Sequence, residues 1–221
     1  ILCVSRFQLV FAVLLAAFTY ISLQKLFHPG WLFGLFVVMI PFYLILTVAR
    51  SHNIEYLNGI FEMKNASMPI FVSQPYIYIA NNYDNFNFLV GALPGHSFGL
   101  KGLFPLWALS GLKFFFPQLI NFPIYVDKTE LTTLTLFYDS YYDFGWIGVL
   151  LFSCILGAIA YILVVKLREM RNPLGYLLYA QFAAYLMLSF FTTWFSNTTT
   201  WFYLILTGIM ALFYHLRASR W

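Results

Sequence analysis

Five runs of apolar residues, separated by polar or basic breaks, dominate the chain. Each run is about long enough to cross a hydrocarbon core of about 30 Å as a helix that rises 1.5 Å per residue. The predicted spans are residues 7–23, 31–49, 146–165, 174–195 and 201–216. This pattern predicts an all-α fold, namely a polytopic membrane protein with about five transmembrane helices in a single domain over residues 1–221.

A long polar segment, residues 50–143, separates the second predicted span from the third. It contains seven of the eight acidic residues of the chain and many Asn, Tyr and Phe residues. Within it, residues 74–89 form an amphipathic, aromatic stretch that is typical of a membrane interface. Residues 100–122 are apolar, but lysines and prolines interrupt them. They could form an interfacial or re-entrant helix, or a complete span, and we prefer the first.

The distribution of basic residues predicts the orientation. Residues 166–171 contain three basic side chains between two predicted spans, which is typical of a cytoplasmic loop. This assignment places residues 196–200 outside and the C-terminus inside. If residues 100–122 do not cross, all of residues 50–143 form one extracytoplasmic loop. That arrangement gathers the acidic and aromatic residues on one side, which is why we prefer it.

The composition agrees with a membrane protein. Hydrophobic residues make up 62% of the chain and charged residues only 9%, with a mean hydropathy of +0.78. A soluble domain has about 25% charged residues. The net charge of +4 reflects topology, so we expect no nucleic-acid partner. Because the chain begins with Ile1 and Arg6 precedes the first apolar run, we expect a fragment that lacks N-terminal spans.

The junction between the polar segment and the third predicted span is the first candidate site. Asp139 and Asp143 are four residues apart, so they share a face if the helix begins early. A carboxylate at this depth must face water or a partner. Asp143 could be a general base that takes a proton from a sugar hydroxyl. It could also cap the third span by accepting backbone N–H groups, and capping is the role that we favour.

Arg6 and Arg50 lie at the outer ends of two adjacent predicted spans. Arginine at such a position can hold a phosphate or pyrophosphate through paired N–H donors. The alternative is that each side chain extends to lipid headgroups. The positive-inside rule disfavours arginine there, which favours a ligand. His52 could act as a general base, because the ordinary histidine pKa is about 6.5, or it could be a solvated loop residue.

Aromatic side chains near the same boundary could stack against sugar rings. Tyr76, Tyr78 and Tyr142 are the candidates for substrate binding, together with Asp139. The alternative is an interfacial belt, the commoner use of tyrosine in membranes. No spacing typical of metal ligands is present, so we predict neither a metal site nor a cofactor.

These features together resemble a known family. Arg6 opens one span, Arg50 closes the next, and a Thr-rich stretch at residues 131–136 precedes Tyr142-Asp143-Phe144-Gly145-Trp146-Ile147-Gly148. Over about residues 5–165, this pattern resembles the C-terminal half of bacterial oligosaccharide repeat-unit polymerases. These are the Wzy-type polymerases of O-antigen, capsule and exopolysaccharide.

The resemblance implies a multi-pass glycosyltransferase of the bacterial inner or plasma membrane. It would join undecaprenyl-pyrophosphate-linked oligosaccharide repeat units on the outer face. Arg6 and Arg50 would engage the pyrophosphate, and His52 or Asp143 would be the base. The implied partners are the lipid-linked oligosaccharide substrate, membrane lipids, a chain-length regulator and a flippase.

Other functions stay open. An O-antigen ligase uses the same kind of donor with another acceptor, and the sequence does not separate the two. A transporter or flippase of lipid-linked oligosaccharide would typically show inverted repeats and broken helices near the midplane, and neither pattern is visible. A structural membrane subunit without chemistry is the remaining alternative.

Overall fold

The computed structural model describes residues 6–24, 53–169, 172–190 and 192–218, with a few isolated positions between residues 30 and 45. This part of the chain is helical and contains no strand, which confirms the all-α prediction. It divides into two compact units, Ile1–Ala80 and Asn81–Trp221. Helix α4 (Ile70–Ala92) passes from the first unit into the second.

The first unit contains α1 (Arg6–Gln24), α3 (Ile54–Ile60) and the beginning of α4. Asn53 caps α3, because its side chain accepts a hydrogen bond from the backbone N–H of Tyr56 at 3.1 Å. The buried amide of Asn58 then donates to the carbonyls of Ala66 and Met68, each at 2.9 Å. These bonds close the turn between α3 and α4.

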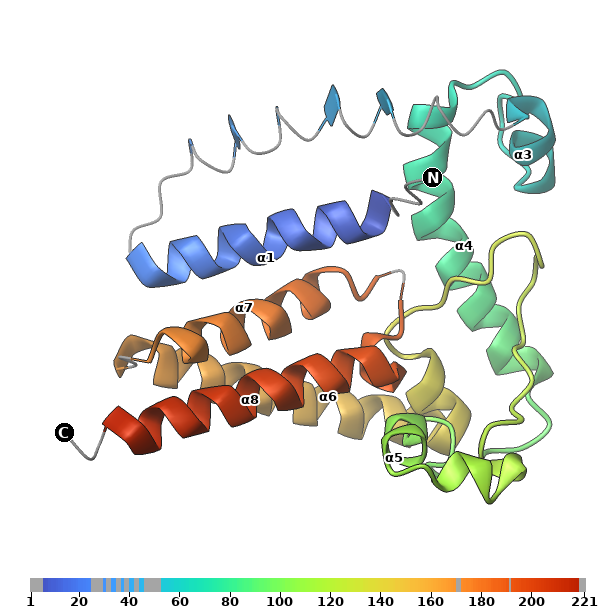
Figure 1. Ribbon diagram of the computed structural model, residues 1–221. Helices are drawn as coiled ribbons and strands as arrows, with labels where there is room; N and C mark the ends of the chain where they lie inside the picture. The colour runs from blue at the N-terminus through green and yellow to red at the C-terminus, as the bar shows by residue number, and fades with distance from the viewer. Residues whose placement is uncertain are drawn as a thin grey trace. The chain divides into compact units, whose positions relative to one another are not determined.

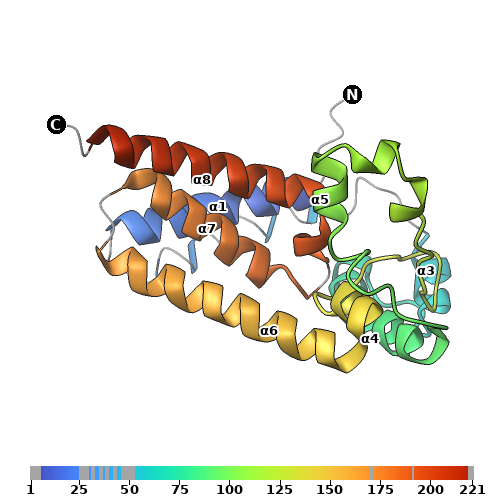
Figure 2. The same cartoon turned by 90° about the horizontal axis from the view of Figure 1, so that it is seen from below.

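The second unit holds the remaining helices. They are α5 (Phe104–Leu109), η1 (Leu112–Phe114), η2 (Pro117–Leu119), α6 (Tyr138–Glu169), α7 (Pro173–Met187), η3 (Trp194–Ser196) and α8 (Thr198–Ala218). Helix α7 contacts both α6 and α8 and lies between them in the view from below (Figure 2). The end of α6 and the C-terminal end of α8 lie at the same end of this three-helix layer (Figure 1).

Two polar contacts fix α7 against α8. Asn172 caps α7 through Leu174 N–H and also donates to the carbonyl of Ala211 at 2.7 Å. Near the middle of both helices, Gln181 Nε2 donates to Thr207 Oγ1 at 3.0 Å, and both residues are buried. A polar pair between apolar helices sets their register, because shifting either helix would leave both groups unpaired.

Helix α6 has two halves that meet at a kink. Phe144 (φ −135°, ψ 15°) and Gly145 (φ 62°, ψ −147°) leave helical geometry. Such a positive φ is open to glycine but strained for other residues. Before the kink lie the polar residues of the junction, and after it the side chains are mostly apolar and exposed. The kink therefore separates a buried polar turn from an exposed apolar rod.

Within the described residues, two helices are long and apolar enough to cross a membrane. They are α6, over Tyr138–Lys166, and α8, over Thr198–Arg217. Both contain predicted spans, and both indicate a membrane protein. The apolar stretch of α1, Val10–Leu23, is shorter, and the predicted span at residues 31–49 lies largely outside the described residues. The count of about five is therefore not confirmed.

The predicted span at residues 174–195 differs most from the structure. Helix α7 ends at Met187 after 15 residues, about 22 Å at 1.5 Å per residue. A turn follows, in which the Ser189 hydroxyl donates to the carbonyl of Tyr185 and Trp194 Nε1 donates to that of Leu188. Hydropathy missed this end because Leu188 and Trp194 remain apolar and buried although the helix has stopped.

Residues 100–122 form no continuous helix. They fold into α5, of six residues, and the short 3₁₀ helices η1 and η2. Pro105 lies in the first turn of α5, Gly111 precedes η1, and Pro117 begins η2. A helix of six residues is far shorter than the ~20 residues that a span requires. This segment therefore contains no helix long enough to span, and the placement of residues 50–143 on one side stays a prediction.

Candidate functional site

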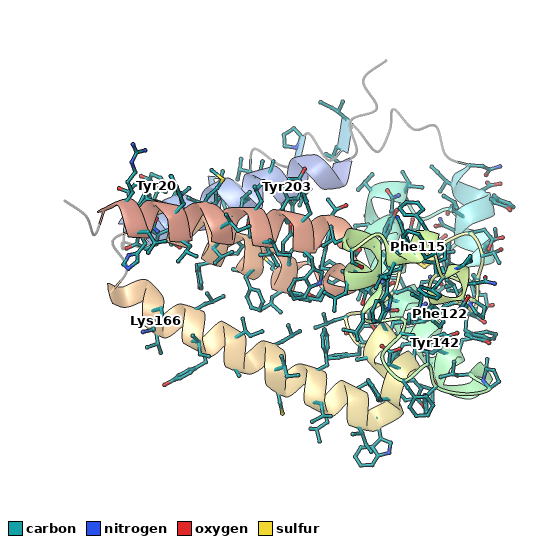
Figure 3. All side chains as sticks on the ribbon, turned by 60° about the horizontal axis from the view of Figure 1, so that its bottom comes forward. Tyr20, Phe115, Phe122, Tyr142, Lys166 and Tyr203 are labelled. Atoms are coloured by element: carbon teal, nitrogen blue, oxygen red, sulfur yellow. The ribbon has the colours of Figure 1, made fainter. Side chains whose placement is uncertain are left out.

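The candidate site lies at the start of α6, where the second unit has its aromatic core. Leu89, Tyr138 and Tyr142 are buried together, and Phe86, Leu93, Phe122, Tyr125, Leu134 and Tyr141 pack around them. Tyr142 and Lys166 lie at opposite ends of α6 in Figure 3, with Phe122 beside Tyr142. The core therefore lies at the N-terminal end of α6, opposite Lys166 in Figure 3.

Side-chain amides from α4 hold the extended segment that leads into this core. Asn85 Nδ2 donates to the carbonyls of Leu131 and Thr133, and its Oδ1 accepts from Asp127 N–H at 3.1 Å. Asn81 donates to the same Leu131 carbonyl at 2.9 Å. The segment pairs with no strand in the described part of the chain. The side-chain amides instead pair the carbonyls of Leu131 and Thr133 and the N–H of Asp127.

Tyr138 fixes the other side of the same segment. Its hydroxyl accepts from the backbone N–H of Tyr125 and donates to the Tyr125 carbonyl, both at 2.7 Å. Tyr138 is fully buried. One hydroxyl thus pairs both backbone groups of a residue that belongs to no helix or strand.

Asp139 and Asp143 follow Tyr138 on one face of α6. The helix begins at Tyr138, and both carboxylates are buried. This confirms the prediction that they share a face. The two carboxylates differ in their partners, so they perform different tasks.

Asp143 ties the loop of residues 97–103 to α6. Its Oδ1 accepts from the Ser97 hydroxyl and from Lys101 N–H at 3.1 Å, and its Oδ2 accepts from Gly102 N–H at 2.7 Å. A Cβ at position 102 would lie 2.6 Å from that oxygen, so glycine is required there. The expectation that Asp143 caps its own span is wrong in one respect: the N–H groups that it pairs belong to another segment.

The kink in α6 strengthens this attachment. Because Phe144 and Gly145 are not helical, the preceding backbone carbonyls can accept hydrogen bonds from N–H groups of another segment. The carbonyl of Tyr142 accepts from Ser97 N–H at 3.2 Å, and that of Asp143 accepts from Phe98 N–H at 3.0 Å. A Cβ on Gly145 would lie 3.1 Å from His96 Nε2. The loop is therefore held by both side chain and backbone.

Asp139 forms a buried ion pair with Lys101. The Lys101 ammonium lies 3.7 Å from Asp139 Oδ1, and the two side chains are 12% and 7% exposed. The same ammonium lies 4.6 Å from the ring centroid of Tyr142 and 5.6 Å from that of Tyr138, an arrangement in which ring faces attract the cation. The hydroxyl groups of Thr193 and Ser196, beyond α7, lie near enough to the Asp139 carboxylate to favour its charged form.

These contacts bring together segments that are distant in the sequence. Leu136 N–H donates to the Ser189 carbonyl at 3.0 Å, so the segment before α6 meets the turn after α7. Residues of two loops, 97–102 and 193–196, lie against this pair of carboxylates. The arrangement can order a hydroxyl-bearing ligand through paired charges and hydroxyls at the end of an apolar helix.

The structure unites only some of the predicted site residues. Asp139, Asp143 and Tyr142 lie together, and Tyr142 is 5% exposed because it packs against Phe122 and Tyr125. Substrate contact through Tyr142 would therefore need the core to open.

The other predicted residues lie elsewhere or outside the described part. Tyr76, which is exposed, and Tyr78 belong to the part of α4 in the first unit. Arg6 begins α1, but its side chain is outside the described residues, as are Arg50 and His52 altogether.

Sequence reasoning missed the partners of the two carboxylates. These partners come from loops that are distant in sequence, and they are Ser97, Lys101, Thr193 and Ser196. One signal was available for Lys101, because it is a single charge near the start of an apolar stretch. Such a charge needs a counter-ion when it is buried.

The described residues include no group of three or more His, Cys, Asp or Glu side chains that could hold a metal ion. The absence of a metal and of a cofactor stays a prediction.

Comparisons with protein-family models, with curated proteins and with solved structures found no match to this chain.

Proposed function

We propose that the protein polymerises undecaprenyl-pyrophosphate-linked oligosaccharide repeat units on the outer face of a bacterial inner membrane. The observation that carries the proposal is the position of the Lys101–Asp139 pair and of Asp143 at one end of α6, a helix apolar enough to span. The reacting bond of a lipid-linked sugar lies at this depth, where pyrophosphate joins lipid to glycan. The resemblance to repeat-unit polymerases supplies the reaction.

In this proposal the chain is a multi-pass protein. Helices α6 and α8 cross the membrane, and the segment at residues 50–143 lies outside with interfacial or re-entrant pieces. Lys166, at the far end of α6 (Figure 3), and Arg217, in the last turn of α8, face the cytoplasm, as the positive-inside rule favours. Lipids, a chain-length regulator and a flippase that supplies the substrate are the proposed partners.

The proposed reaction is glycosyl transfer. A hydroxyl oxygen of the acceptor repeat unit attacks the anomeric carbon of the donor glycan, and the bond from that carbon to the pyrophosphate oxygen breaks. The electron pair leaves with the pyrophosphate, and the hydroxyl proton passes to a base or to water. Arg6 and Arg50 stabilise the charge that develops on the pyrophosphate. Because pyrophosphate is a good leaving group, these arginines contribute more than the base does.

The described residues suggest separate roles for the carboxylates. Asp143 already accepts three hydrogen bonds from residues 97–102, so we assign it to positioning this loop. Asp139, which Lys101 and two hydroxyls face, is the better candidate to orient an acceptor hydroxyl. It is as buried as Tyr142, so this contact also requires the site to open. His52 is the alternative base.

A complementation experiment tests the proposal. The full-length gene, with Arg6→Ala, Arg50→Ala, Asp139→Asn or Asp143→Asn, is expressed in a strain that lacks it, and surface polysaccharide is separated by size. We expect wild type to restore long chains and the arginine variants to leave single repeat units. Asp84→Asn, at an exposed position of α4, is the matched control. Normal chain lengths from both arginine variants at equal protein levels would contradict the proposed chemistry.

The alternatives give different results. A ligase defect would leave long chains that remain on the lipid carrier. A flippase defect would leave repeat units on the cytoplasmic face, where external enzymes cannot reach them.

A further inference from the structure

The segment between α5 and the aromatic core carries an unusual exposed tip. Phe114 and Phe115 are each 78% exposed, and Phe116 is 47% exposed. Leu112 and Ile120 beside them are exposed as well. We call Leu112–Ile120 the aromatic tip. Such a concentration of exposed large apolar side chains usually marks an interaction surface.

We infer that the aromatic tip inserts into the interfacial region of the phospholipid bilayer. The inference rests on the membrane placement of α6 and α8 in the proposed function. It goes beyond that placement because it names the residues that enter the lipid and the depth that they reach.

The composition of the tip favours lipid over a glycan or an aqueous surface. Between Gly102 and Val126, Lys113 is the one charged residue. A sugar site would need several convergent polar groups, whereas the exposed residues of Leu112–Ile120 are apolar except for Gln118. Lys113 fits a bilayer, because its ammonium lies 5.1 Å from the Phe114 ring centroid. It can reach lipid phosphates while the rings enter the acyl boundary.

The backbone of the tip sets the depth. Its 3₁₀ turns, η1 and η2, leave N–H and C=O groups that no long helix pairs. Lipid-exposed backbone of this kind does not occur in the hydrocarbon core. The tip can therefore enter only as far as the headgroup and upper acyl region. Gly111, with φ 77°, makes the turn that begins it.

The position of the aromatic tip in the second unit also favours contact with the lipid bilayer. Helix α5, which immediately precedes the tip, contacts α8 and lies at the N-terminal end of α8 in Figure 2. Phe115 lies at the same end of the unit as Tyr142, opposite Lys166 (Figure 3). The tip is thus near the level at which α8 would emerge from the bilayer, and the apolar surface of that helix continues toward it.

Site-directed spin labelling tests the inference on the whole chain. Cys3→Ser and Cys154→Ser remove the natural thiols, and a nitroxide is placed at Phe115→Cys, Leu151→Cys or Glu130→Cys. Leu151 is exposed on the apolar half of α6, and Glu130 is an exposed charged residue. Each protein is reconstituted into phosphatidylcholine–phosphatidylglycerol vesicles. Collision with oxygen and with a water-soluble nickel chelate then reports depth.

We expect the oxygen-to-nickel collision ratio at position 115 to fall between the low value at 130 and the high value at 151. A ratio at 115 equal to that at 130, with 151 in lipid, would overturn the inference but leave the membrane placement intact. A water-accessible label at 151 would overturn both. Strong spin–spin coupling between labels at 115 would show that a second copy covers the tip, which also overturns the inference.

A second label guards against a local effect of the first substitution. Phe114→Cys should give the same intermediate depth as Phe115→Cys. Lys113→Glu should lower the collision ratio at position 115 in vesicles rich in phosphatidylglycerol, because it replaces attraction to the anionic surface with repulsion. An unchanged ratio in that variant would contradict the role given to Lys113.

Discussion

The two halves of α6 use similar residues for opposite purposes. Before the kink, Tyr142 is 5% exposed and its neighbours fill the aromatic core, whereas Tyr161 after the kink is 71% exposed. The first half finds its partners within the protein, through hydrogen bonds, an ion pair and stacked rings. In the second half, most side chains are exposed and have no partner helix from the described part of the chain over them. Stability of this unit therefore comes from one end of α6, and affinity for a lipid phase from the other.

We expect the largest change in the free energy of unfolding from disrupting the buried ion pair between Lys101 and Asp139. Lys101→Met leaves the Asp139 carboxylate buried without its cation and should lower the free energy of unfolding by about 4 kcal/mol. Adding Asp139→Asn should recover most of that loss, because the amide is neutral and can still pair with the nearby hydroxyls. SDS titration of the purified protein in mixed micelles measures both.

Lys113→Met, on the aromatic tip, is the matched control and should change the free energy of unfolding by less than about 0.5 kcal/mol. Additive losses from the two substitutions at Lys101 and Asp139 would show that they do not act as a pair.

Two glycines of α6 provide the next test. A Cβ at Gly148 would clash with the Ser140 carbonyl oxygen, whereas a Cβ at Gly157 meets nothing within 4 Å. Gly148→Ala should therefore lower the free energy of unfolding by about 3 kcal/mol. Gly157→Ala should raise it by up to about 1 kcal/mol, since alanine is the better helix former. Equal effects of the two changes, in the same titration, would mean that the kink tolerates side chains.

A smaller effect is expected from one hydroxyl. Tyr138→Phe removes the group that pairs both backbone atoms of Tyr125, and the loss should be about 2 kcal/mol, because buried backbone groups would lack partners. Tyr161→Phe makes the identical chemical change in the exposed half and should have no measurable effect. The difference between their thermal midpoints in detergent measures the contrast, and its absence would contradict the assigned role.

The smallest effect concerns the pair between α7 and α8. Gln181→Leu removes the hydrogen bond to Thr207 and should lower the free energy of unfolding by about 0.6 kcal/mol, the average for such bonds between membrane helices. In the described structure the Gln181 Oε1 atom has no hydrogen-bond partner, so its removal offsets part of the loss. Thr207→Val, titrated in parallel, should behave similarly. A loss above about 2 kcal/mol from either change would show that the pair is worth more than these bonds usually are.

Much of this contrast could be predicted from the sequence. Apolar runs indicated α6 and α8, because helices exposed to lipid need little beyond length and hydrophobicity. The spacing of Asp139 and Asp143 correctly placed them on one face, since that relation is local. For residues 100–122 a complete span was one of two alternatives, and the structure has only short helices there.

What the sequence concealed was non-local. Lys101 N–H and Gly102 N–H reach Asp143 across 42 and 41 residues, and no periodicity reports such a pairing. The prediction for Asp143 had the right acceptor and the right kind of donor, but the donors came from a different segment. The end of α7 was missed for a related reason. Buried apolar residues continue past Met187 because tertiary packing, not the helix, requires them.

The shortness of α7 has a consequence for the lipid around it. If the three-helix layer is embedded, a helix of about 22 Å lies beside longer neighbours in a core of about 30 Å. The bilayer can meet such a mismatch by thinning locally. Thr193 and Ser196, which follow the end of α7, would then bring water and headgroups down to Asp139. In the proposed reaction, a sugar would reach Asp139 from water where the bilayer is thin, while its lipid carrier stays in the hydrocarbon.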